Sequence, residues 1–128
     1  MDHHILLINP WIFDFSAYDF WYKPLGLLSL AALLRINGVS ISWIDCLDPA
    51  HPDLLRESHI RMPKRKRSGE GTYASERIPP PPPLKGIQRH YKRYGITPRI
   101  FLNNLNAIPR PDLIMITSMM TYWCNVAH

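Results

Sequence analysis

Three groups of polar residues in this sequence follow short apolar runs, which is where a parallel sheet presents side chains to a ligand. Ligands of open parallel sheets bind beyond the carboxyl ends of the strands. Amide, carboxylate and hydroxyl groups at that edge can hydrogen-bond a cofactor, although the same residue types are also common in turns and caps. The predicted cofactor-binding residues are Asn9, Pro10 and Trp11; Asp45 and Cys46; and Thr117, Ser118, Met119, Met120 and Thr121.

The apolar runs have the lengths and patterns of strands. Ile5 to Ile8 is unbroken and typical of a strand buried on both faces, residues 40–45 alternate between apolar and polar side chains, and Leu113 to Ser118 is a second buried-type strand. Right-handed crossovers would place the first strand in the centre. We therefore predict a partial Rossmann-like (flavodoxin-like), doubly wound α/β fold with three parallel strands in the order 2-1-3.

Two helices are expected between these strands. The first has Pro24 in its first turn and ends at Asn37-Gly38, and its apolar residues fall on two sides, so both sides should be largely covered. One side carries Leu27, Leu30, Ala31 and Leu34, and the other carries Leu28, Ala32 and Ile36. Thr97-Pro98 is a cap and first residue for a second, shorter helix.

Residues 48–97 form a Pro-rich and basic insertion with little periodicity, inside a single domain that spans residues 1–128. We expect it to be irregular, with residues 63–74 as its most mobile part. The basic run 61–67 could bind nucleic acid, but a solvated loop is the preferred interpretation. The prolines 79–83 could dock on an aromatic groove, but a stiff spacer is preferred.

Composition excludes several classes of protein. The 128 residues are 46% hydrophobic, which is enough for a core, and carry a net charge of +5. Two cysteines, Cys46 and Cys124, suggest neither a disulfide framework nor a zinc site. The sequence has no secretory signal and no apolar run of membrane-spanning length, so we expect a soluble, cytoplasmic protein. Neither a G-x-G-x-x-G nor a P-loop motif is present.

The chain resembles the start of B12 (cobalamin)-binding radical-SAM proteins over nearly its whole length. The resemblance rests on Ile5 to Pro10, on residues 18–34 (YDFWYKPLGLLSLAALL), on Ile44 to Asp48, on residues 78–87 and 93–96, and on residues 117–123. It implies a cobalamin-binding domain, with the corrin lying on the predicted strand ends beside an aromatic first loop.

The chain lacks the motifs on which that family's chemistry depends. The C-x-x-x-C-x-x-C motif, which holds a [4Fe–4S] cluster for S-adenosylmethionine, does not occur, and Asp48-Pro-Ala-His51 has the wrong spacing for the D-x-H-x-x-G lower-ligand motif. We therefore predict no catalytic and no metal-ligating residues, and a chain truncated before the radical-SAM domain, which would be its partner. Cobalamin binding should be weak, and the unpaired edge of the last strand could cause self-association.

Two other functions stay open. The chain could be a non-enzymatic interaction or nucleic-acid-binding fragment that acts through the insertion, although we regard nucleic acid as an unlikely partner. It could also be the N-terminal half of another Rossmann-like enzyme, such as a glycosyltransferase. The aromatic residues between Trp11 and Tyr22 could contact a planar ligand, but a core or an interdomain contact is the preferred interpretation.

Overall fold

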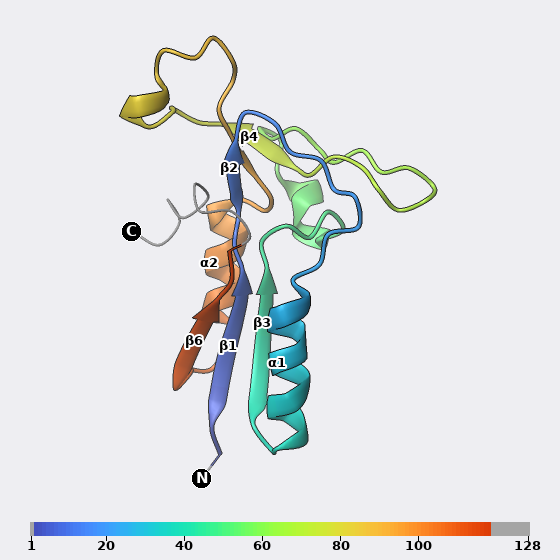
Figure 1. Ribbon diagram of the computed structural model, residues 1–128, viewed down its shortest axis with the longest axis vertical. Helices are drawn as coiled ribbons and strands as arrows, with labels where there is room; N and C mark the ends of the chain where they lie inside the picture. Colours follow the sequence, from blue (N-terminus) through green and yellow to red (C-terminus); the bar gives the residue numbers. More distant parts are fainter. Residues whose placement is uncertain (1, 119–128) are drawn as a thin grey trace.

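The computed structural model describes residues 2–118 and has a mixed α/β architecture. Its main sheet has three parallel strands, with β1 (His4–Asn9) between β3 (Ser40–Asp45) and β6 (Leu113–Ile116) (Figure 1). Leu7 of β1 is opposite Trp43 of β3 and Met115 of β6. The predicted α/β class and the three parallel strands are thus confirmed.

Helices pack on both faces of this sheet because the side chains of β1 alternate between them. Ile5 and Leu7 pack with Leu27 of helix α1 (Leu25–Ile36). Leu6 and Ile8 pack with Ile100 of helix α2 (Pro98–Asn106) on the other face. β1 is therefore buried on both sides, as the unbroken apolar run predicts.

The sequence signals at the helix ends are largely confirmed. Pro24, expected in the first turn, lies one residue earlier, at the N-cap position of α1. Gly38, just after the helix, has a φ of 81°, a conformation that glycine adopts without strain. The Thr97 hydroxyl accepts a hydrogen bond from Ile100 N at 3.2 Å and so caps α2. In the described part of the chain, neither α1 nor α2 has the length and apolar character needed to cross a membrane.

The prediction that α1 is covered on both sides is wrong for the described residues. Leu28 and Ile36 are 37% and 83% exposed, and Ala32 is also exposed. A single three-stranded sheet can cover only one stripe of a helix, and Leu27, Ala31 and Leu34 form that stripe. Strand β6, expected to be of the buried type, lies at the sheet edge, where Leu113, Ile114 and Ile116 are about half exposed.

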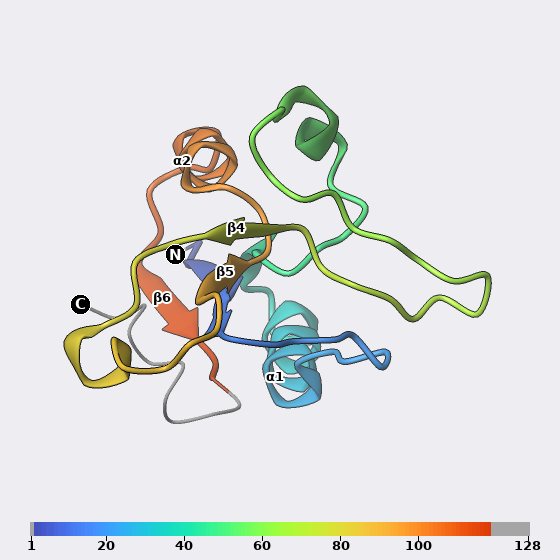
Figure 2. The same ribbon diagram turned by 90° about the horizontal axis from the view of Figure 1, so that it is seen from above.

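A second sheet, which the sequence did not predict, stands over the carboxyl ends of the parallel strands (Figures 1 and 2). It is antiparallel, with β5 (Lys92–Tyr94) between β2 (Ile12–Asp14) and β4 (Ser75–Arg77). The buried side chains of Ile12, Leu47, Tyr73 and Tyr94 form its core. The insertion also contains two short 3₁₀ helices, Pro52–Arg56 and Pro82–Leu84.

Candidate functional site

Asn9 and Asp45 join the ends of the two neighbouring strands β1 and β3. They are opposite each other in the parallel register, and the Asn9 side-chain amide donates a hydrogen bond to Asp45 Oδ1 at 2.9 Å. The same carboxylate oxygen accepts a hydrogen bond from Leu47 N at 3.0 Å. Because Asn9 is buried, this pair fixes the orientation of an amide and a carboxylate at the predicted ligand edge.

Burial and the Asp45 carboxylate also affect two neighbouring acids. Burial, and then the negative charge of Asp45, raises the pKa of Cys46 to about 12. The same two causes, in the same order, raise the pKa of the Tyr22 phenol. Both groups are therefore neutral near pH 7. Cys46 is a thiol rather than a nucleophilic thiolate, and Tyr22 is a neutral hydroxyl that can donate or accept a hydrogen bond.

Trp11 closes the strand-end region from the side of α2. Its indole Nε1 donates a hydrogen bond to Ile96 O at 2.5 Å, and its ring packs against Phe101 with 5.0 Å between the ring centroids. The space that remains is a cavity of about 10 Å³, which can hold one water molecule. The cavity is lined by Asn9, Pro10, Trp11, Ile12, Tyr22, Leu47 and Ser118.

The structure brings only some of the predicted residues to this cavity. Asn9, Pro10, Trp11 and Ser118 line it, and Asp45 lies beside it through its bond to Asn9. Cys46 is fully buried in the core next to α2, and Thr117 donates its backbone N–H to Ile8 O at 3.3 Å. Three predicted residues, Met119, Met120 and Thr121, lie outside the described residues.

Sequence reasoning missed Ile12, Tyr22 and Leu47 as lining residues. Tyr22 lies in the aromatic loop that the sequence marked as a whole, but no spacing indicates which of its rings turns toward Asp45. Ile12 and Leu47 reach the cavity because they pack in the second sheet, which the sequence did not predict.

The described residues hold no group of three or more His, Cys, Asp or Glu side chains that could bind a metal ion. A larger hollow of about 590 Å³ lies away from the strand ends, between α1 and the outer edge of β3. It is mostly apolar, and its lining includes Leu28, Ala31, Arg35, Val39 and Trp43.

Comparisons with family models, with curated proteins and with solved structures found no match to this chain.

Proposed function

We propose that this chain is the non-catalytic, cofactor-side module of a cobalamin-binding radical-SAM protein, with the carboxyl edge of the parallel sheet as its ligand edge. The observation that carries the proposal is the hydrogen bond between Asn9 and Asp45 across the ends of β1 and β3. Both residues belong to the segments in which the sequence resembles that family. In this proposal the three strands are the first part of a Rossmann-like, doubly wound sheet with strand order 2-1-3.

The described residues do not fit a whole corrin. The cavity of about 10 Å³ is far smaller than such a ring, and Trp11 and the second sheet occupy the space above the strand ends. Within the described residues the site also holds no histidine that could approach the metal. No chemical step through cobalamin therefore follows from this arrangement.

What these side chains can do is bind one small polar group. The cavity has room for one group of the size of a water molecule, and Asn9 and Tyr22 are among the residues that line it. A large ligand could place a peripheral polar group there while the rest of it stays outside. Because so little of such a ligand would be buried, we expect weak binding, with a dissociation constant of about 0.1 mM or higher.

Equilibrium dialysis of hydroxocobalamin, quantified by its visible absorption, tests this function. We expect saturable binding with weak affinity. Ser118→Ala should weaken the binding because it changes the wall of the cavity, and Asn9→Ala should weaken it further. Asn103→Ala is the matched control, because Asn103 is exposed on α2. Circular dichroism establishes that each variant is folded.

Two outcomes contradict the proposal in different ways. If the protein retains no hydroxocobalamin at saturating concentration in the dialysis, cobalamin is not the ligand of this edge. Submicromolar binding would instead show that the second sheet moves away from the strand ends, against the closed geometry described above. Equal weakening by Asn9→Ala and by Asn103→Ala would place the binding site elsewhere.

A further inference from the structure

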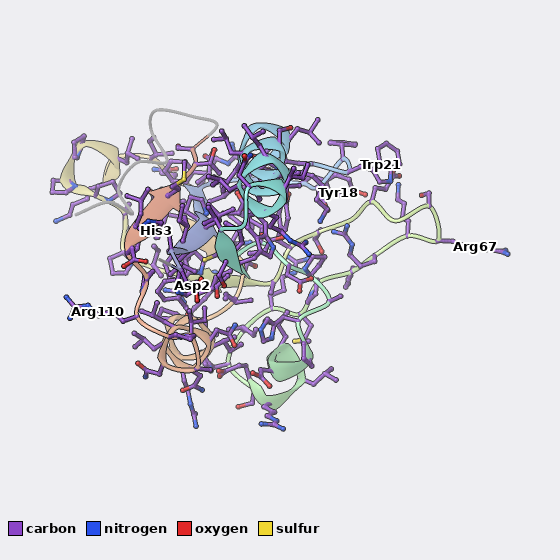
Figure 3. The ribbon with its side chains drawn as sticks, turned by 90° about the horizontal axis from the view of Figure 1, so that it is seen from below. Asp2, His3, Tyr18, Trp21, Arg67 and Arg110 are labelled. Carbon is purple, nitrogen blue, oxygen red and sulfur yellow. The ribbon has the colours of Figure 1, made fainter. Side chains whose placement is uncertain are left out.

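Two loops that are far apart in the sequence form one projecting surface. The aromatic loop, residues 15–22, contains Tyr18, Phe20 and Trp21, which are 36%, 68% and 59% exposed. The basic hairpin, residues 61–75, lies beside it and carries the run Lys64 to Arg67. Figure 3 shows Tyr18 and Trp21 next to this hairpin and Arg67 at its far tip. We call the combined surface the aromatic–basic tip.

The two loops are held together through Asp19. Its backbone exchanges two hydrogen bonds with Gly71, at 2.9 and 3.1 Å, and its buried carboxylate accepts a hydrogen bond from Arg65 at 2.6 Å. Burial and the adjacent Asp19 carboxylate raise the pKa of the Tyr73 hydroxyl, which also hydrogen-bonds to Asp19. A paired and well-hydrogen-bonded charge of this kind fixes the geometry of the segments that it joins.

Trp21 is held in an exposed position by a strained backbone. Its φ of 62° is uncommon for a bulky residue, and its indole N–H donates to Ser68 O at 2.9 Å. Gly69 lies under the indole, where an added Cβ would be 3.4 Å from Nε1. Backbone strain that keeps a large ring in solvent is typical of residues that contact a ligand.

The charge of the tip is positive. Arg65 is paired with Asp19 and Lys66 with Glu70, at 2.6 and 3.2 Å, which leaves Arg61, Lys64 and Arg67 as further exposed cations of the hairpin. The rings of Tyr18 and Phe20 are in contact, with 4.6 Å between their centroids. Exposed rings beside cations match the bases and phosphates of a single-stranded nucleic acid.

We infer that the aromatic–basic tip binds single-stranded nucleic acid, with bases stacked on Phe20 and Trp21 and phosphates along the basic hairpin. Stacking does not require a particular base, so binding is tolerant of sequence. Duplexes bind more weakly because their bases are already stacked. An anionic membrane fits less well, because Arg67 projects at the tip while the rings lie along its flank (Figure 3). The inference does not depend on the proposed cofactor edge.

Fluorescence anisotropy with labelled oligothymidine and oligouridine tests the inference. Phe20→Ala removes an exposed ring, and we expect it to raise the dissociation constant about tenfold. Trp21→Ala should do the same, and Leu55→Ala, at a site 83% exposed, is the control. Because Phe20 is exposed, its removal leaves the fold intact even if the change at Trp21 disturbs the loop.

Salt dependence provides a second measurement. Three phosphate contacts to a single strand predict a slope of log K against log[salt] of about −2. The double variant Lys64→Ala with Arg67→Ala should reduce the magnitude of this slope by about 1.4. The control is Arg99→Ala with Arg110→Ala, since both arginines are exposed and lie at the ends of the α2 region. Figure 3 shows Arg110 far from the tip.

Any of three results would overturn the inference. The first is that neither oligonucleotide binds at 50 mM salt. The second is that single strands and duplexes bind with equal affinity, and the third is that Phe20→Ala, Trp21→Ala and Leu55→Ala bind the oligonucleotides with equal affinity. Vesicles that contain phosphatidylserine form a separate arm. Vesicle binding without oligonucleotide binding would identify the tip as a membrane contact instead.

Discussion

Gly95 joins the insertion to the core, and its replacement by alanine should strongly destabilise the protein. Its φ is +125°, a region that only glycine adopts readily, and an added Cβ would overlap the Cys46 carbonyl oxygen and lie 3.0 Å from Trp11 Cδ1. The backbone cannot yield easily, because Gly95 N donates to Ala74 O and Ile96 N donates to Cys46 O, each at 2.7 Å.

The expected loss follows from these contacts. Forcing a side chain into this backbone region costs about 1–3 kcal/mol. Moving the chain away from Cys46 also weakens the Ile96–Cys46 hydrogen bond and the Trp11–Ile96 hydrogen bond, each worth about 1 kcal/mol. The total is about 3–5 kcal/mol, a large fraction of the 5–15 kcal/mol that is typical of folded domains.

Urea unfolding followed by tryptophan fluorescence measures this loss. We expect the midpoint of Gly95→Ala to fall by about 2 M at an unchanged slope of 1–3 kcal/mol per M. Gly86→Ala is the matched control, because an added Cβ there has no atom within 4 Å and its φ is not positive. A loss below about 1 kcal/mol in Gly95→Ala, or an equal loss in Gly86→Ala, would refute this reasoning.

Three further predictions concern pH, proteolysis and association. Burial raises the pKa of the Cys46 thiol to about 12, compared with 9.0 for a free thiol. As the pH rises, the unfolded state therefore loses this proton before the folded state does. The free energy of unfolding should then fall by up to about 1.4 kcal/mol per pH unit from pH 9 upward. Urea unfolding from pH 8 to 10.5, compared with Cys46→Ser, measures this, and equal pH slopes would contradict it. Trypsin should cut first beside Arg67, at the hairpin tip, and mass spectrometry of the first fragments measures where it cuts. Initial cleavage in α1 would contradict this prediction. The exposed apolar side of α1 should cause self-association. The double variant Leu33→Lys with Ile36→Lys should therefore have a lower sedimentation coefficient than the parent chain at high concentration. A parent chain that is monomeric at that concentration would rule out self-association through α1.

The main sheet could be predicted because its signals are local. Ile5 to Ile8 identified a strand buried on both faces, and Thr97-Pro98 identified the start of α2. The second sheet could not be predicted in this way, because β2, β4 and β5 have three residues each and no alternating pattern can be read from so few. Their pairing is set by the burial of Ile12 and Tyr94, which are remote from each other in the sequence.

The candidate sites, too, could be predicted only where their signals are local in the sequence. Strand-end chemistry indicated Asn9 and Asp45, and the structure joins them by a hydrogen bond. The size of the cavity depends on Trp11 and on the second sheet, so sequence alone could not show that the edge is nearly closed. In the sequence the aromatic–basic tip is two separate features, since Arg65 and Asp19 are 46 positions apart and no spacing rule relates them.

The parallel main sheet also constrains how the chain folds. β1 is near one end of the described chain and β6 near the other, so a hydrogen bond such as that from His4 N to Asp112 spans 108 positions. The bond that fastens Trp11 to Ile96 spans 85. Loops of this length must close before these contacts stabilise the structure, so we expect refolding in milliseconds to seconds. Stopped-flow tryptophan fluorescence measures this rate, and refolding within microseconds would contradict it. Until β6 docks, β1 has an unpaired edge, which gives other chains an opportunity to pair with it during synthesis.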